Sequence, residues 1–361
     1  MKKNKIMKIA VGLLLGATMT FGLFGCSGSD SESSTAGSTE NKKEESKTIT
    51  MVWYPNESGG DLEDARNEVG KVVEKATGKK VEHKLTTDYS VAIESIANGT
   101  AGICFMGPQG YVEAHTKNEK VVPLVVNSGA SGTLDDAKYY SWLAVTKENA
   151  DQYKKGGSYA IDNIQGKKMS FVSNSSTSGF KVPTSSIVSY FSKEDKWKDL
   201  KAEDLMEGGS DKFFSEVMYG GSHQGSAVNL LTGKSDVAAF CDTVLVNYVE
   251  AEEGEFNAVG TTYKVKADAT EPFNTLVGKE FTAIASTPVL NSPFAINTEV
   301  ISEEDKKKLV EAFTSDEVTN NTKIFVPKSD ENTKGFFKKE ADEKFLEVDD
   351  KWFDPIRELS K

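Results

Sequence analysis

Arginine is nearly absent from this sequence of 361 residues. Only Arg66 and Arg357 occur, and neither lies in a loop that holds other chemically distinctive residues. The guanidinium group of arginine binds carboxylates and phosphates through two parallel N–H groups, so a clamp of that kind is not available here. A site for an anion would have to use neutral hydrogen-bond donors, and its selectivity would depend on geometry.

Positive charge is scarce as a whole. The chain has 43 Lys and Arg against 55 Asp and Glu, which gives a formal net charge of −12 at pH 7. Residues 1–25 hold four lysines and no acid, so their removal would change the charge to −12 − 4 = −16. An acidic protein is repelled by phosphate backbones, and we therefore expect no nucleic-acid partner.

Cysteine and histidine are equally rare, with three residues of each type. Cys104 and Cys241 lie in or beside short apolar runs, so we expect two buried thiols rather than a disulfide. The histidines are scattered and lack the cysteine or acid spacing of a zinc site. We predict no metal site and no cofactor.

The Gly-x-Ser-x-Gly turn of many hydrolases is also missing around any serine with a matching acid and histidine downstream. Such a turn exposes the nucleophilic serine between a strand and a helix. Its absence argues against a secreted hydrolase that would use Ser178 or His223 as a reactive group. We predict that the protein is not an enzyme.

The first 25 residues predict a processing signal. Four lysines precede an apolar run from Ile9 to Phe24, and Gly25 precedes Cys26. A basic region, a short apolar region and a small residue before a cysteine resemble a bacterial lipoprotein signal, although Phe24 is bulkier than usual at its position. The alternative is an ordinary cleaved signal with an incidental cysteine.

Residues 26–47 would then link a lipid on Cys26 to the folded part of the protein. This stretch is rich in Ser, Gly, Glu and Lys and has almost no apolar residues. It cannot bury enough surface to fold, so we expect a disordered tether. These features predict an extracytoplasmic protein whose folded part is held by a lipid just outside the membrane.

From residue 48 onward, apolar patterns of strand and helix type alternate. Ile49–Tyr54 alternates as a strand does, and Leu62–Thr77 has apolar residues on one helical face before Gly78 ends the helix. Further strands are expected at Val81–Leu85, Ile103–Phe105, Val121–Val126, Trp142–Val145, Met169–Val172 and Val237–Phe240. Further helices are expected at Val182–Phe191, Ser226–Thr232, Thr243–Glu250, Glu303–Thr314 and Lys344–Leu359. This alternation predicts an α/β protein with mixed, mostly parallel sheets covered on both faces.

The second half repeats part of the first, which predicts two lobes around a cleft. Lobe 1 is expected to comprise 48–143 and 283–361, and lobe 2 to comprise 144–282. A two-segment hinge would cross near Tyr140–Thr146 and Phe281–Pro288. Residues 252–280 are interpreted as an irregular insertion or return. Ligands of open α/β sheets bind outside the carboxyl ends of the strands, so the cleft is the expected site.

One loop in this pattern suits an anion. Ser173–Gly179 reads Ser-Asn-Ser-Ser-Thr-Ser-Gly and joins the strand Met169–Val172 to the helix Val182–Phe191. Backbone N–H groups at a helix start and several hydroxyl groups then lie at one point, which is an arrangement that binds oxyanions. A plain loop with a helix cap is the alternative.

Six short motifs in one order and spacing resemble those of the phosphonate/phosphite/phosphate-binding proteins of ABC importers. The motifs are Thr87-Asp88-Tyr89-Ser90, Phe105-Met106-Gly107-Pro108, Tyr139-Tyr140-Ser141, Ser176-Thr177-Ser178-Gly179 with Val182-Pro183, Gly221-Ser222-His223 and Phe240-Cys241-Asp242. The likeness covers roughly residues 49–300. It implies a type II periplasmic-binding-protein fold, an ABC permease as partner and a lipoprotein in Gram-positive bacteria. We expect a monomer.

The resemblance also implies roles for individual residues. In the family the Ser-Thr-Ser run holds the phosphonate oxygens, which corresponds to Ser176, Thr177 and Ser178. Two tyrosines reach the ligand from the opposite side, and they fall on Tyr89 and Tyr139. A tyrosine O–H can donate to an anion while its ring excludes water. The alternatives are a surface-packed residue at a helix start for Tyr89 and a core residue of a hinge strand for Tyr139.

Two further positions complete the implied site. His223 fits the ligand-binding histidine of the family, and its ring can donate to an anion, more strongly if protonated. Asp242 falls at or beside an acid that contacts the ligand in the family, where it can accept a hydrogen bond from a P–OH group. A cap at the start of the helix Thr243–Glu250 is an equally good interpretation of Asp242, and both roles are compatible.

The ligand is expected to be small and to lack an amine. Family members that bind aminoethylphosphonate carry additional acids for its ammonium group, where this chain has Thr243 and Ser292. We therefore predict phosphite, methylphosphonate or phosphate. The alternatives are another small anion or a pyrimidine-type ligand in the same fold, or a sensory lipoprotein without a role in transport.

Overall fold

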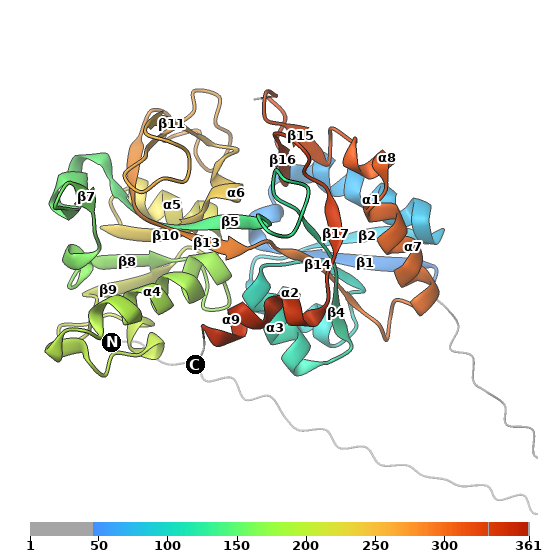
Figure 1. Ribbon diagram of the computed structural model, residues 1–361, viewed down its shortest axis with the longest axis horizontal. Helices are drawn as coiled ribbons and strands as arrows, with labels where there is room; N and C mark the ends of the chain where they lie inside the picture. Colours follow the sequence, from blue (N-terminus) through green and yellow to red (C-terminus); the bar gives the residue numbers. More distant parts are fainter. Residues whose placement is uncertain (1–45, 331, 360–361) are drawn as a thin grey trace, which may run out of the picture. The chain divides into compact units, whose positions relative to one another are not determined.

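The computed structural model describes residues 46–330 and 332–359 (Figure 1). The expected signal peptide, the lipidation site Cys26 and nearly all of the tether lie outside the described residues. Within the described ranges, none of the helices combines the length and the apolar character needed to cross a membrane.

The first sheet has six strands in the order β17-β4-β14-β3-β1-β2. Their bounds are β1 Thr48–Trp53, β2 Lys80–Leu85, β3 Ile103–Phe105, β4 Val121–Asn127, β14 Pro293–Asn297 and β17 Phe345–Glu347. The helices that cover it are α1 Glu63–Thr77, α2 Tyr89–Ala97, α3 Pro108–Lys117, α7 Glu303–Phe313 and α8 Asp316–Thr319. A small pair of parallel strands, β15 Phe325–Pro327 and β16 Phe337–Lys339, flanks this sheet.

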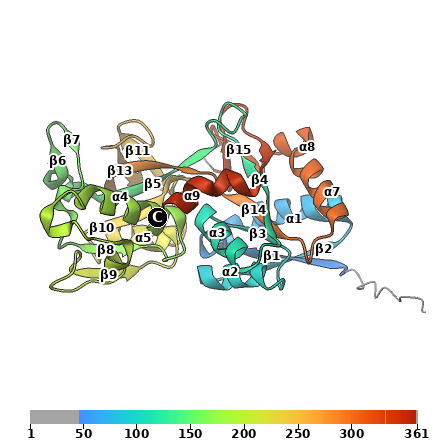
Figure 2. The same ribbon diagram turned by 60° about the horizontal axis from the view of Figure 1, so that its bottom comes forward.

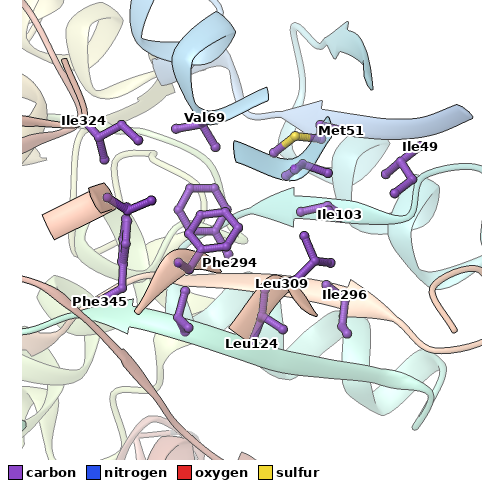
Figure 3. Close-up of a cluster of buried hydrophobic side chains, with 14 of the residues drawn as sticks. Ile49, Met51, Val69, Ile103, Leu124, Phe294, Ile296, Leu309, Ile324 and Phe345 are labelled. Carbon is purple, nitrogen blue, oxygen red and sulfur yellow. The ribbon is translucent and has the colours of Figure 1, made fainter. Parts of the chain in front are cut away.

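Strand β1 shows how the alternation of the sequence builds two cores. Its residues Met51 and Trp53 pack with α1 and α7 on one face of the sheet, and Val52 packs with α2 and α3 on the other. Successive residues of a strand point to opposite faces, so a strand that is covered on both sides is apolar at nearly every position. Figure 3 shows the first of these cores, in which Phe294 of β14 and Leu309 of α7 also lie.

The second sheet has seven strands in the order β11-β12-β13-β5-β10-β8-β9. Their bounds are β5 Lys138–Thr146, β8 Lys168–Phe171, β9 Glu216–Tyr219, β10 Val237–Cys241, β11 Val249–Glu253, β12 Thr262–Val265 and β13 Glu280–Leu290. The helices beside it are α4 Val182–Phe191, α5 His223–Leu231 and α6 Asp242–Leu245. A two-stranded hairpin, β6 Lys154–Lys155 with β7 Ser158–Tyr159, lies outside both sheets.

The sheets are mixed, as expected, but the prediction that they are mostly parallel is wrong. Of the eleven pairings in the two sheets, four are parallel: β1–β2, β1–β3, β8–β10 and β8–β9. The strands β11, β12 and β13 follow one another without a crossover helix, and strands joined in that way pair antiparallel. For the same reason the stretch 252–280 is not simply irregular, because it contributes β12 to the sheet.

The two long strands β5 and β13 pair antiparallel along most of their length and lie entirely in the second sheet. The chain changes sheets between Asn127 and Lys138, and again between Leu290 and Pro293. The expected boundaries at 143 and 283 fall inside these strands. We call 46–137 with 291–359 the first lobe and 138–290 the second lobe.

Two helices expected from the sequence are wrong in extent. Residues 344–359 begin with the strand β17, and only the short turns Asp350–Phe353 and α9 Asp354–Glu358 are helical. Residues 345–347 form a strand and not a helix because pairing with β4 places Phe345 in the first core. The helix expected over Thr243–Glu250 ends at Leu245, since Val249 already pairs with β12.

The end of the chain contacts both lobes (Figure 2). Helix α9 lies against α3 of the first lobe, where Arg357 and Tyr111 both bond Asp350. Its Ile356 packs with Tyr139 and Val182 of the second lobe. This tail therefore adds a third link between the lobes beside the two crossing segments.

Candidate functional site

Loops that follow strands of both sheets meet around one cavity of about 70 Å³. The first lobe contributes residues that follow β1 and β3, and the second lobe contributes residues that follow β8 and β10. A cavity needs about 10–15 Å³ of such space to hold one water molecule, so this cavity suits a ligand of a few heavy atoms. The carboxyl ends of parallel strands form this site, as they do in other open α/β sheets.

The hydroxyl loop lies on the second-lobe wall of the cavity. Ser176, Thr177 and Ser178 are all buried and all line it. Ser176 caps the helical turn Thr177–Lys181, and its Oγ accepts a hydrogen bond from the N–H of Gly179 at 3.1 Å. A side chain at Gly179 would collide with Val172, since an added Cβ would lie 2.2 Å from its Cγ2. Glycine at this position lets the loop fold back onto the strand that it follows.

Two hydroxyl groups of this loop remain available to bond a ligand. Thr177 Oγ1 accepts a hydrogen bond from the N–H of Gln109 in the first lobe at 2.8 Å, so its own proton is left for another acceptor. Ser178 Oγ is buried without a hydrogen-bond partner among the described residues. Gly107 makes the contact with Thr177 possible, because a Cβ there would lie 2.9 Å from Thr177 Oγ1.

The two tyrosines line the same cavity. Tyr89 begins α2 and is 3% exposed, so the alternative of a surface-packed residue does not describe it. Its hydroxyl oxygen accepts from Nδ2 of Asn56 at 2.6 Å, which leaves its proton available. Tyr139 lies in β5 and is buried as well. Burial raises the pKa of both tyrosines, so both are neutral donors at pH 7.

His223 lies at the start of α5, where Ser222 caps the helix. Its Nδ1 accepts a hydrogen bond from the N–H of Cys241 at 3.0 Å. Burial lowers the pKa of His223 to about 3, so the ring is neutral at pH 7 and its one proton is on Nε2. His223 is therefore a neutral N–H donor in this structure, rather than the stronger charged donor that its residue type allows.

Asp242 is placed differently from the other predicted residues. Its carboxylate accepts hydrogen bonds from the N–H groups of Tyr140 and Thr243, both at 2.8 Å, and from Nδ2 of Asn257 at 2.9 Å. It is buried but is not among the residues that line the cavity. Burial raises its pKa to about 6 in spite of these three donors. As the first residue of α6, it ties that helix to β5, and contact with a ligand stays a prediction.

Sequence reasoning missed two residues of the first-lobe wall, Asn56 and Glu57. Asn56 joins the lobes, since its Oδ1 accepts from the N–H of His223 and its backbone carbonyl accepts from Nε2 of Gln224, both at 2.9 Å. Glu57 is a buried acid in the cavity wall. Both residues lie in the short helical turn Pro55–Glu57 after β1, and their place at the carboxyl end of a parallel strand was the signal that could have identified them.

The cavity wall contains no lysine and no arginine. Thr243 and Ser292, which stand where some family members have additional acids, both lie in the wall. Over the described part of the chain, no three side chains of His, Cys, Asp or Glu lie in an arrangement that could hold a metal ion. Cys104 and Cys241 are buried free thiols, as expected. The site is therefore built from neutral donors, together with the acid Glu57.

Two α/β lobes around a small cavity, with hydroxyl groups and an imidazole in its wall, form the architecture that two-lobed solute-binding proteins share. A family model described as "ABC transporter, phosphonate, periplasmic substrate-binding protein" matches residues 51–353. The chain belongs to this family of periplasmic binding proteins, in agreement with the motifs of the sequence.

Relatives agree with this assignment. The phosphate-import protein PhnD of Mycolicibacterium smegmatis (strain ATCC 700084 / mc(2)155) is 30% identical over 223 residues. The match spans 61% of this chain and 61% of the length of that relative.

Solved structures show the same fold. A binding protein component of an ABC phosphonate transporter from Pseudomonas aeruginosa has a TM-score of 0.58 at 18% identity, over 87% of this chain and 85% of that chain. PhnD1 from Prochlorococcus marinus (MIT 9301), in complex with methylphosphonate, has a TM-score of 0.58 at 14% identity, over 87% of this chain and 97% of its own. The two-lobed α/β fold predicted from the sequence is confirmed.

Proposed function

We propose that this protein is the receptor of an ABC importer for a small phosphorus oxyanion, namely phosphite, methylphosphonate or phosphate. The observation that carries the proposal is the convergence of hydroxyl groups and one imidazole N–H on a cavity without basic side chains. Ser176, Thr177 and Ser178 supply hydroxyl donors at a helix start, and His223 supplies Nε2–H. A tetrahedral anion can accept from all of these donors at once.

Ligand binding in this scheme favours the conformation in which the lobes contact each other. The bond from Gln109 to Thr177 and the bond from His223 to Asn56 both cross between the lobes beside the cavity. A ligand that touches both walls stabilises this arrangement over more open ones, which is a shift of populations and needs no chemical step. The closed surface is what an ABC permease would recognise.

We also propose the location inferred from the first residues of the sequence. The basic and apolar stretch before Cys26 would direct export, and a lipid on Cys26 would hold the receptor outside the membrane. Mass spectrometry of the protein from a membrane fraction tests this. Cys26 should be the first residue and should carry the mass of acyl chains, whereas an unmodified start elsewhere would contradict the anchor.

The central test replaces His223 by asparagine. An asparagine amide oxygen can still accept from the N–H of Cys241, but it offers nothing at the position of Nε2. Calorimetry should show a loss of about 10- to 150-fold in affinity for methylphosphonate, phosphite or phosphate, because a hydrogen bond to a charged group contributes about 1.5–3 kcal/mol. The melting temperature of the ligand-free variant should change little.

His83→Asn is the matched control. His83 Nδ1 also accepts a hydrogen bond, from Nε1 of Trp53 at 3.0 Å, but His83 does not line the cavity. This variant should bind as the unchanged protein does. Tighter binding of aminoethylphosphonate than of the other three ligands would contradict the predicted ligand. Stabilisation by pyrimidines or other anions, but by none of these compounds, would overturn the proposed function.

A further inference from the structure

Glu57 is the acid of the cavity wall, and its surroundings set it apart from the other acids of this protein. Glu57 is 8% exposed and lines the cavity together with Tyr89 and His223. Its Oε2 is buried without a hydrogen-bond partner among the described residues. A buried polar group that faces a cavity without a partner has a free energy to gain from a ligand that supplies one.

The nearby arginine does not neutralise this acid. Arg66 donates from Nη1 to the backbone carbonyls of Glu57 and of Gly59, the latter at 2.8 Å. Among the described residues, no ion pair within 4.0 Å joins the carboxylate of Glu57 to any basic group. The guanidinium group of Arg66 therefore fixes the backbone of the loop and leaves the carboxyl group to the cavity.

We propose that Glu57 determines ligand specificity as a carboxylic acid, whose O–H donates a hydrogen bond to an oxygen of the bound anion. The proposal rests on the function proposed above. When the carboxyl group of the free protein is ionised, binding takes up one proton from the solvent onto Glu57, and no covalent bond to the ligand forms. A carboxylic acid kept neutral in an apolar site is a known way to donate to an oxyanion at neutral pH.

The charges around Glu57 agree with this role. Burial raises the pKa of Glu57 to about 8, and only the Asn56 side chain, the backbone of Glu57 itself and the charge of Arg66 oppose the effect. An anion beside the carboxyl group would raise this pKa further, because a like charge disfavours the ionised form. The protein gains a donor in a wall that has no cation.

The groups that face Glu57 from the neighbouring elements titrate outside the relevant range. Burial raises the pKa of every tyrosine and thiol among them, and His223 is already neutral. These groups are Tyr54 after β1, Tyr89 of α2, Cys104 of β3, Cys241 of β10, Tyr248 after α6 and the cation Arg66 of α1. Proton uptake above pH 7 therefore reports on Glu57 and on the ligand itself.

A different role for the same residue makes the opposite prediction. An ionised Glu57 could bind the ammonium group of aminoethylphosphonate. Binding of that ligand would then require the charged carboxylate and would weaken as the pH falls. The sign of the pH dependence separates the two roles.

The experiment compares the unchanged protein with Glu57→Gln, in which an amide replaces the carboxyl group at nearly the same size. Calorimetry measures the affinity for methylphosphonate at about pH 6, 7, 8 and 9. We divide the dissociation constant of the unchanged protein by that of Glu57→Gln at each pH. This ratio does not depend on the titration of the ligand, which affects both proteins equally. It should rise about tenfold for each pH unit above the pKa of Glu57 in the free protein, with the unchanged protein weakening at high pH.

A second measurement does not depend on the variant. Titration of the unchanged protein in two buffers of different ionisation enthalpy gives the number of protons taken up on binding. At about pH 8 this number should be larger than the ligand alone requires, and Glu57→Gln should remove the excess. Glu82→Gln, an exposed acid on β2, is the matched control and should behave as the unchanged protein does.

The outcomes are distinct. A ratio that does not change with pH, together with equal proton counts, overturns the role of Glu57 and leaves the proposed function in place. A ratio that falls with pH, with selective loss of aminoethylphosphonate binding in Glu57→Gln, assigns Glu57 to an ammonium group and also overturns the role as a donor. If neither protein binds any of the four phosphorus compounds, the proposed function itself fails.

Discussion

Two buried acids, Glu57 and Asp242, come after the carboxyl ends of β1 and β10. The hydrogen bonds that the two acids make differ. Three N–H groups donate to Asp242, and it does not line the cavity. Glu57 lines the cavity, and its Oε2 has no such donor. Position at the carboxyl end of a strand brings an acid near a site, but the hydrogen bonds that it already makes decide whether it is available to a ligand.

The largest expected effect comes from removing the acid whose bonds are satisfied. Asp242→Ala leaves the N–H groups of Tyr140 and Thr243 and the amide of Asn257 without their acceptor. Each buried unsatisfied donor costs about 1–3 kcal/mol, so the free energy of unfolding should fall by about 3 kcal/mol or more. Urea unfolding at pH 7 measures this change.

Glu57→Ala is the counterpart and should destabilise the protein by less, because no donor loses a partner at Oε2. In Glu57→Ala, the loss in the free energy of ligand binding should be larger than the loss in the free energy of unfolding. A larger destabilisation for Glu57→Ala than for Asp242→Ala would show that the comparison is wrong, and that Glu57 is the structural acid of the two.

The next effect is the pH dependence of stability. Glu57 has a pKa raised to about 8 in the folded protein from 4.5, so its stabilising contribution is complete below pH 4.5 and is lost as the pH rises through 8. The pKa of Asp242 is raised to about 6 from 3.8, and its contribution is lost by about that pH. Between pH 6 and 8, therefore, only Glu57 of these two acids should lower the stability.

Urea unfolding at pH 6 and at pH 8 tests this prediction. The free energy of unfolding of the unchanged protein should fall relative to that of Glu57→Gln by up to about 1.4 kcal/mol per pH unit. His223 contributes equally to both proteins, since its lowered pKa favours the folded state above pH 6.5 in each. Parallel pH profiles for the two proteins would mean that Glu57 is not a buried, uncompensated acid.

The smallest effect is expected from a third acid at the rim of the cleft. Asp61 of the first lobe accepts from the hydroxyl of Tyr248 at 2.8 Å and from Thr270 Oγ1 at 3.0 Å, both in the second lobe, and pairs with Lys334 at 3.2 Å. Asp61→Asn keeps an acceptor but removes the charge. Asp61 does not line the cavity, and the amide still offers an acceptor to the two hydroxyl groups, so ligand affinity should fall by no more than about fivefold, or about 1 kcal/mol.

Salt provides the check on Asp61. The difference between Asp61→Asn and the unchanged protein should shrink in part between about 0.02 M and about 0.5 M salt, because the side chains of Asp61 and Lys334 are 16% and 15% exposed and salt ions can approach them. The effect of Glu57→Gln should persist at both concentrations, because Glu57 is buried. Equal sensitivity to salt would place Glu57 in contact with bulk solvent and weaken the contrast between buried and rim acids.

The sequence by itself determined the local parts of the site. Turn and cap residues act within a few positions of the chain, so the loop with Ser176 and Thr177 and the helix that follows Ser222 were predictable from the residues beside them, although this helix begins at His223 and not at Ser226. The alternation of β1 and the helix α1 were predictable for the same reason. The ordered motifs added the family, and with it the pairing of these loops across a cleft.

The tertiary structure decided what these residues can do. Asp242 is satisfied by Tyr140, a residue 102 positions away, and the ring of His223 has its proton on Nε2 because the N–H of Cys241 bonds Nδ1. Phe345 forms a strand because β4 offers it an edge and a core. Glu57 has a raised pKa because the folded chain buries it and leaves its Oε2 without a hydrogen-bond partner among the described residues. Solvent exclusion and strand pairing depend on residues far apart in the chain, which local sequence patterns do not encode.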